Sequence, residues 1–235
     1  MSTGKKTKKP TVSVIIPAIN EGKILLKVIN ETLKIDKYKM DVMVIIDSKA
    51  DAETVKVAKQ SKARVINIGK GMGKGTAVRK SIPYIKGEYT VQIDADYQFM
   101  PYEIPKLLAY LEKGYDVALG TRYQKGAKIE ANSVSYLRLL GSFGLSLITT
   151  VFIQKRITDV MAGFKAFKTP VLKDLNPQVN HFGYEAELVV RAAKRKYKII
   201  NVPIHYKRRV LGETNVSSIK HGLLVLDSII KTAIE

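Results

Sequence analysis

Short apolar runs alternate with segments of helical spacing along the first 125 residues. The runs are rich in β-branched residues and read as buried strands: Val12–Ile16, Val42–Ile46, Arg64–Ile68, Tyr89–Ile93 and Asp116–Leu119. The segments between them read as amphipathic helices: Glu21–Leu33, Ala52–Gln60, Gly75–Ile85 and Pro101–Lys113. This alternation predicts an α/β fold with a mostly parallel central sheet and helices on both faces.

The second half of the chain has a less regular pattern. It predicts helices at Val134–Phe152, Gly183–Lys196 and Ser217–Ile234, with a strand-like run at Ile199–Tyr206. The last helix is amphipathic. We therefore divide the chain into a basic flexible tail (residues 1–10), an α/β domain (residues 11–215) and a C-terminal amphipathic helix (residues 216–235).

The composition limits the chemistry that the chain can carry. A length of 235 residues and 46 % hydrophobic residues suit one large globular domain. Because there is no cysteine, disulfides, thiolate metal sites and thiol nucleophiles are excluded. The three histidines argue against a multi-histidine zinc site, so a bound metal is expected to have oxygen ligands.

The net charge of +19 favours polyanionic partners: nucleic acid, phosphorylated substrates or an anionic membrane. A lysine-rich surface of the thermophile type explains part of this charge. A non-catalytic nucleic-acid-binding protein is an alternative interpretation of this charge. The chain lacks a recognition motif and interleaved surface aromatics, so we expect no nucleic-acid partner.

Neither the tail nor any apolar stretch predicts membrane insertion. The tail has no apolar core of the kind found in signal peptides. The apolar run Gly144–Ile153 is shorter than the roughly 20 residues of a membrane span. We expect a cytoplasmic protein that is soluble or peripheral on the cytoplasmic face of a membrane.

The most informative local feature is the pair of carboxylates in Asp94-Ala95-Asp96, directly after the strand Tyr89–Ile93. Two carboxylates at the end of a buried strand can hold a hard divalent cation from one side, which leaves its other face for phosphate oxygens. Gln98 adds an amide oxygen. An Asp-x-Asp motif alone is weak evidence, because it occurs by chance in many loops.

Several other polar segments are expected at the same edge of the sheet, where parallel sheets bind ligands. These segments are Pro17–Glu21, Asp47, Gly69–Gly75 and Gly120–Arg122. The glycine-rich segment resembles a phosphate-binding loop before a helix N-terminus, although its spacing is not that of a Walker A motif. A flexible surface turn is the alternative interpretation. Arg79, one turn into that helix, is in a position to reach back towards the site.

The ordered series of motifs resembles family 2 glycosyltransferases of the GT-A fold, and among them the dolichyl- and polyprenyl-phosphate sugar synthases. The matching segments are Pro17–Glu21, Gly73–Arg79, Asp94–Gln98 with Pro101 and Glu103, Gly120–Tyr123, Asp159–Phe167, Phe182–Leu188, Val202–Ile204 and Arg209–Gly212. Two segments depart from the family pattern. Asp47–Asp51 lacks the usual Asp-Asp-Gly-Ser turn, and Thr214-Asn215 stands where Ser-Lys is expected.

The resemblance implies a nucleotide-sugar donor, either GDP-mannose or UDP-glucose. Its diphosphate would be joined through Mg²⁺ or Mn²⁺ to Asp96 and Gln98, with Asp94 on the metal or the ribose. The implied donor-binding residues are Pro17, Ala18, Glu21, Asp47, Lys74 and Arg79.

The resemblance also implies a dolichyl or polyprenyl phosphate acceptor, clamped by Arg122, Arg138 and Arg209, with Ser142 one turn after Arg138. Arginine suits this task because its planar fork binds phosphate in a bidentate manner. Each arginine has a structural ion pair as its alternative role. Glu185 is a candidate base if the acceptor is instead a soluble hydroxyl compound, such as phosphoglycerate or a glycan; the alternative is a carboxylate favoured by a helix dipole.

The C-terminal helix has two interpretations. It docks on a membrane surface or a membrane-protein partner, or it packs on the domain or in a homodimer.

Overall fold

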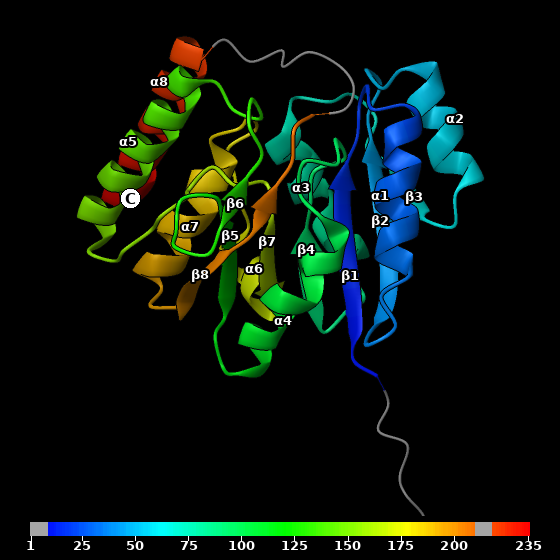
Figure 1. Cartoon of the computed structure of the whole chain (residues 1–235), viewed down its shortest axis with the longest axis horizontal. Helices are drawn as coiled ribbons and strands as arrows, with labels where there is room; N and C mark the ends of the chain where they lie inside the picture. Colours follow the sequence, from blue (N-terminus) through cyan, green and yellow to red (C-terminus); the bar gives the residue numbers. More distant parts are fainter. Residues whose placement is uncertain (1–8, 210–217) are drawn as a thin grey trace, which may run out of the picture.

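The computed structural model describes residues 9–209 and 218–235. Most of the predicted tail lies outside the described residues, as do the motif positions Gly212, Thr214 and Asn215. The described residues form a central sheet with helices on both faces (Figure 1). This confirms the predicted α/β architecture.

The central sheet has seven strands in the order β3-β2-β1-β4-β7-β5-β8. Their bounds are β1 Thr11–Pro17, β2 Lys39–Ile46, β3 Arg64–Asn67, β4 Tyr89–Gln92, β5 Val117–Thr121, β7 Lys165–Lys168 and β8 Ile199–Pro203. All neighbouring pairs are parallel except those of β7, which runs antiparallel to both β4 and β5. A separate two-stranded sheet pairs β6 (Lys128–Ile129) with β9 (His205–Tyr206).

Alternation along the strands divides the core into two layers. On one face of the sheet, Val12, Val14 and Ile16 of β1 pack with helices α1 (Lys23–Leu33), α2 (Ala52–Gln60) and α4 (Ile104–Glu112). On the other face, Ile15 and the inward residues of β2 pack with four further helices. These are α3 (Lys74–Ser81), α6 (Thr169–Leu175), α7 (Tyr184–Lys194) and α8 (Ser218–Ile234).

Two parts of the sequence prediction need correction. The run 199–206 is not one strand: β8 ends at Pro203 and β9 begins at His205. Strands β6 and β7 and helix α6 were not predicted. β7 was missed because its sequence, Lys-Ala-Phe-Lys, carries a lysine at each end and lacks the apolar run that marked the other strands.

Helix α5 (Tyr136–Ile153) lies within two residues of the predicted helix Val134–Phe152 and extends well beyond the apolar run 144–153. Within the part of the chain that the structure describes, it is the one helix whose length and composition would allow it to cross a membrane, with a mean hydropathy of 1.6. Figure 1 shows α5 beside α8 at the left margin of the molecule, at the opposite end of the sheet from α2. α8 buries Val225 and Ile229 in the core, so its inner face serves packing.

Candidate active site

The turn after β1 is fixed by its own glutamate. The backbone N–H of Ala18 donates to the carbonyl of Ile45 at 2.9 Å, which joins the turn to β2. Glu21 Oε2 accepts from the backbone N–H groups of Ile19 at 2.6 Å and Asn20 at 2.9 Å. Burial raises the pKa of Glu21, against the opposing effect of these two bonds. Glu21 therefore fixes the turn that follows Pro17 and Ala18.

Asp47 follows β2 and lies directly under the glycine-rich loop. Its Oδ1 accepts from the Lys49 N–H at 2.8 Å, which orients the carboxylate. A Cβ added to Gly71 would lie 1.6 Å from Asp47 Oδ2, so only glycine allows the loop to pass there. The structure thus brings Asp47 and the glycine-rich loop together, as the sequence predicted.

The first carboxylate of the Asp-x-Asp motif is paired with a lysine. Lys74 Nζ lies 2.5 Å from Asp94 Oδ1 and 3.1 Å from Glu185 Oε1. Burial raises the pKa of Asp94 to about 6, although the Lys74 ammonium opposes this shift. A predicted donor-binding lysine is therefore already in contact with the predicted metal ligand.

The second carboxylate occupies a turn with an unusual backbone. Tyr97 has a φ of 61°, a left-handed conformation that is uncommon for a residue other than glycine. Its hydroxyl donates to Glu31 at 2.6 Å, which anchors the turn. Asp96 Oδ1 accepts from the Gln98 N–H at 3.1 Å, and Asp96 Oδ2 lies 3.7 Å from Arg209 Nη2.

These carboxylates fit a divalent cation that takes further ligands from elsewhere. Burial raises the pKa of both Asp94 and Asp96, so a cation beside them would stabilise their charged forms. Gln98 donates its amide Nε2 to the Lys207 carbonyl at 3.1 Å, which leaves Oε1 as the atom for a cation. The described residues contain no cluster of three or more acidic or histidine ligands, so phosphate and water oxygens would complete the coordination.

A buried charged network lies beneath Asp94. Glu185 Oε1 accepts from Gln92 Nε2 at 2.8 Å and from the Tyr184 hydroxyl at 2.5 Å, and Glu185 Oε2 contacts the ammonium of Lys165. Burial alone would raise the pKa of Glu185, but Lys165 and Lys74 hold it below the usual value. Glu185 is 1 % exposed. This placement corrects the proposal that Glu185 acts as a base: it anchors Lys74.

Arg122 makes the structural ion pair that the sequence analysis gave as its alternative role, and Arg79 does not reach towards the site as expected. Arg122 makes a bidentate pair with buried Asp159, with Nε–Oδ2 at 2.7 Å and Nη2–Oδ1 at 2.9 Å, so most of its fork is already engaged. Arg79 donates to the Gln178 carbonyl at 2.6 Å and to Asn180 Oδ1 at 2.8 Å instead of reaching back to the carboxylates. Its effect on the site is indirect, because the Asn180 carbonyl accepts from the N–H of Gly75.

An open groove of about 1060 Å³ begins beside the Asp-x-Asp turn. Gln98, Arg122 and Arg209 line one end, and Arg138 and Ser142 of α5 also line it, so the groove brings together the residues that the sequence analysis expected at the acceptor. Its other walls are mainly apolar: Leu137, Leu140, Leu145, Ile148, Met161, Phe182, Leu223, Val225 and Leu226. Buried Arg209 Nε has no hydrogen-bond acceptor among the described residues. The groove therefore suits a molecule with an anionic head and an apolar body.

The sequence analysis gave no role to the residues that support the site from below, although Gly163, Lys165 and Tyr184 lie in the matching segments. Gln92, Lys165 and Tyr184 complete the network around Glu185, and Gly163 lies against Asp94. The available signal was a glutamine in an otherwise apolar strand, because a buried polar side chain needs a polar partner.

Replacing Gly163 by alanine should destabilise the protein. The new Cβ would lie 2.2 Å from Asp94 Oδ2, so the carboxylate must move away from Lys74. We expect the free energy of unfolding in urea to fall by about 1–3 kcal/mol. Gly144→Ala in α5 is the matched control, because nothing lies within 4 Å of its added Cβ. Equal stability of Gly163→Ala and wild type would contradict the close approach of Gly163 to the Asp94 carboxylate.

Comparison with known proteins identifies the family and the fold of the chain. The family described as "Glycosyl transferase family 2" matches residues 13–175. A dolichyl-phosphate hexose transferase of Haloferax volcanii is 28 % identical, over 95 % of this chain and 94 % of the relative. A dolichol-phosphate mannosyltransferase of Pyrococcus furiosus is 30 % identical, over 87 % of this chain and 59 % of the relative.

Among solved structures, glucosyl-3-phosphoglycerate synthase of Mycobacterium tuberculosis, in complex with Mn²⁺, UDP-glucose and phosphoglyceric acid, superposes with a TM-score of 0.76. The match covers 95 % of this chain and 80 % of that one at 20 % identity, which supports the GT-A fold. Family match, fold and site agree: the chain belongs to glycosyl transferase family 2 and is a glycosyltransferase.

Proposed function

We propose that the protein transfers a hexose from a nucleotide-diphosphate sugar, GDP-mannose or UDP-glucose, to a polyprenyl phosphate such as dolichyl phosphate. The observation that carries this proposal is the groove. Its arginine-lined end adjoins Asp96, and its body is apolar. The names of the Haloferax and Pyrococcus relatives support the same acceptor class.

The donor would bind across the ends of β1, β2 and β4. Pro17, Ala18, Glu21 and Asp47 form the nucleoside side, and the glycine-rich loop lies over Asp47. Asp96, Asp94 and Gln98 would hold Mg²⁺ or Mn²⁺ against the diphosphate; Mn²⁺ accompanies UDP-glucose in the mycobacterial neighbour. The bound cation supplies charge neutralisation of the departing nucleoside diphosphate.

The acceptor phosphate would lie at the arginine-lined end of the groove. Arg209 offers a buried Nε that has no hydrogen-bond acceptor among residues 9–209 and 218–235, and its Nη2 lies close to Asp96. A phosphate oxygen attacks the anomeric carbon as the bond from that carbon to the diphosphate breaks, with inversion. Because the acceptor is already an anion, no protein base is needed, which agrees with the burial of Glu185.

A soluble acceptor such as phosphoglycerate is the second candidate. The mycobacterial neighbour was crystallised with phosphoglyceric acid, but that likeness is one of fold. A small polar acceptor would leave the apolar walls between α5 and α8 without a role in transfer. The groove therefore favours the lipid.

An acceptor competition assay tests the proposal. The protein is incubated with labelled GDP-mannose or UDP-glucose, Mn²⁺, dolichyl phosphate and phosphoglycerate. The expected result is label that extracts into organic solvent. A labelled water-soluble product distinct from the donor, with no extractable label, would assign the soluble acceptor. A shift in melting temperature with one of the two donors would identify the nucleotide.

Arg209→Ala should weaken acceptor use. Loss of a charge-assisted contact to phosphate is expected to lower transfer about 10- to 100-fold, mainly through a higher KM for the lipid phosphate. Arg195→Ala is the control, because Arg195 pairs with Asp174 at the surface. An unchanged KM for the acceptor in Arg209→Ala would remove Arg209 from the acceptor site.

A further inference from the structure

Helix α5 carries a continuous apolar stripe on its outer face. Tyr136, Leu140, Phe143, Leu147 and Val151 follow each other at spacings of four, three, four and four residues, and each is between 48 % and 76 % exposed. This spacing places them on one face of the helix. We call these five residues the α5 stripe. Large exposed apolar patches on a folded domain mark contacts with partners or membranes.

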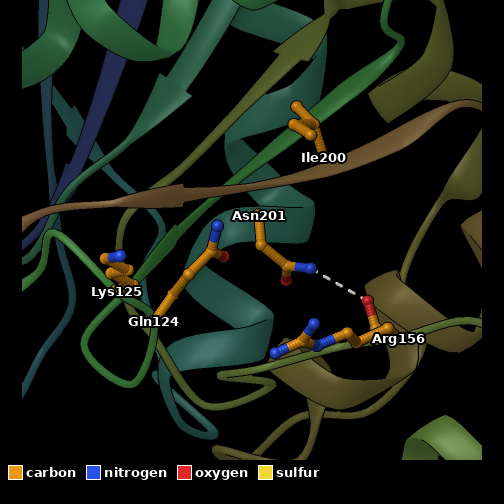
Figure 2. A pocket seen from close by; sticks show the side chains of 5 residues that line it. All are labelled: Gln124, Lys125, Arg156, Ile200 and Asn201. Carbon is orange, nitrogen blue, oxygen red and sulfur yellow. Dashed lines mark hydrogen bonds between the residues drawn. The ribbon is translucent and has the colours of Figure 1, made fainter.

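The segment of the chain that contains the α5 stripe carries cationic residues and no acidic ones. The chain has no acidic residue between Glu130 and Asp159, whereas Arg138, Lys155 and Arg156 lie in that interval. Beyond the end of α5, a hollow of about 260 Å³ is lined by Gln124, Lys125, Arg156, Ile200 and Asn201 (Figure 2).

The hollow has cations but no anion. Neither the Lys125 nor the Arg156 side chain has a hydrogen bond or ion pair within residues 9–209 and 218–235. Asn201 Nδ2 donates to the Arg156 carbonyl at 2.9 Å, which ties the segment after α5 to the edge strand β8. A phosphate group of a lipid fits this combination of charge and position.

We infer that the α5 stripe lies in the interface of an anionic lipid bilayer, with Lys125 and Arg156 contacting lipid phosphate at its end. The inference rests on the proposed function, because it explains how a lipid acceptor enters the groove. Leu140 belongs to the stripe and also lines the groove, so the two surfaces are continuous. The net charge of +19 favours an anionic membrane and opposes a second copy of the chain as the occupant.

An interfacial position suits α5 better than a membrane-spanning one. Ser146 and Thr149 are buried, and α5 packs against α7 and α8. A spanning helix would have to leave these contacts and carry Arg138 out of the groove.

The sequence analysis left two interpretations open for α8, docking on a membrane or packing. Val225 and Ile229 of α8 pack in the core, whereas Leu223 and Ile234 are exposed. The inference assigns the main docking surface to α5, because its five exposed apolar residues form one stripe.

Vesicle flotation tests the inference with residues that do not line the groove. The full chain should float with phosphatidylcholine vesicles that contain about one-third phosphatidylglycerol and should float poorly with phosphatidylcholine alone. The triple variant Phe143→Ser, Leu147→Ser, Val151→Ser should bind the anionic vesicles at least about tenfold more weakly. Leu26→Ser with Tyr84→Ser is the control, because both residues are exposed and apolar but lie elsewhere.

Charge reversal tests the hollow separately. Lys125→Glu with Arg156→Glu should also weaken vesicle binding about tenfold or more, whereas Lys56→Glu with Lys59→Glu on α2 should not. Equal losses in the variants and their controls would overturn the docking surface. So would wild-type protein that does not float, or a wild-type dimer in sedimentation velocity that the triple variant abolishes.

Transfer to a short, water-soluble prenyl phosphate separates the two proposals. The triple variant should keep wild-type transfer in this vesicle-free assay while losing vesicle binding. No transfer by the wild type together with intact flotation would overturn the proposed acceptor and leave the docking surface in place.

Discussion

Asp96→Asn is expected to lower sugar transfer by roughly 10³-fold, because several kcal/mol of charge stabilisation depend on a cation at this carboxylate. The substitution keeps the shape of the side chain and removes its charge. Asp96 Oδ2 has Arg209 Nη2 as a distant neighbour at 3.7 Å, so this oxygen remains accessible to a cation. Initial rates of transfer with saturating Mn²⁺ measure the effect.

The controls for this prediction distinguish the loss of the Asp96 carboxylate from the loss of any one negative charge and from unfolding. Asp36→Asn, at an exposed position, should keep wild-type rates. Asp96→Asn should remain folded, with a melting temperature near that of wild type. A variant that is folded and keeps more than about one-tenth of the wild-type rate would show that Asp96 does not act through a cation.

Lys165→Met is expected to cost about 3–5 kcal/mol of the free energy of unfolding, because it leaves the buried Glu185 carboxylate without its main counter-charge. Lys165 is fully buried, and its ammonium contacts both Glu185 and the carbonyl of Ala162. In a domain of this size such a loss corresponds to a melting temperature lower by roughly 10 °C. Urea denaturation measures the loss directly.

Lys168→Met provides the matched control on the same strand. Its ammonium pairs with Asp116 at 2.9 Å but is 36 % exposed, and exposed pairs contribute at most about 1 kcal/mol. Lys165→Met with Glu185→Gln should recover part of the stability lost in the single variant, because it removes both charges. Equal effects of the two lysine substitutions would contradict the buried network.

The sequence predicted the parts of the fold that depend on apolar periodicity. The helix Ala52–Gln60 has the predicted bounds, and the first five strands lie within a few residues of prediction because each contains apolar residues that pack in the core. β7 was not predictable in this way. It is stabilised by pairing with β4 and β5, which lie far from it in sequence.

In the candidate site, too, some features could be predicted from the sequence and others could not. The Asp-x-Asp turn, Asp47 and the glycine-rich loop follow strands, so their meeting at one sheet edge could be predicted from topology. The partners of Glu185 and Arg122 could not, because Lys165 and Asp159 reach them only through the packed tertiary structure. Spacing in the sequence identifies a charged residue but does not tell whether its charge is already neutralised.

Membrane contact depends on exposure, which the sequence did not reveal. Both α5 and α8 read as helices with apolar residues, and the amphipathic spacing of α8 left membrane docking and packing open. The structure buries the Val225 and Ile229 face of α8 and leaves Phe143 and Leu147 of α5 exposed. The two helices differ in what they pack against.

Crystals soaked with Mn²⁺, a non-hydrolysable sugar nucleotide and a short-chain prenyl phosphate test the account most directly. We expect the cation between Asp96 and the diphosphate, the prenyl phosphate at Arg209, and the prenyl chain along the groove between α5 and α8. A cation bound away from Asp96, or a prenyl chain outside the groove, would contradict the account.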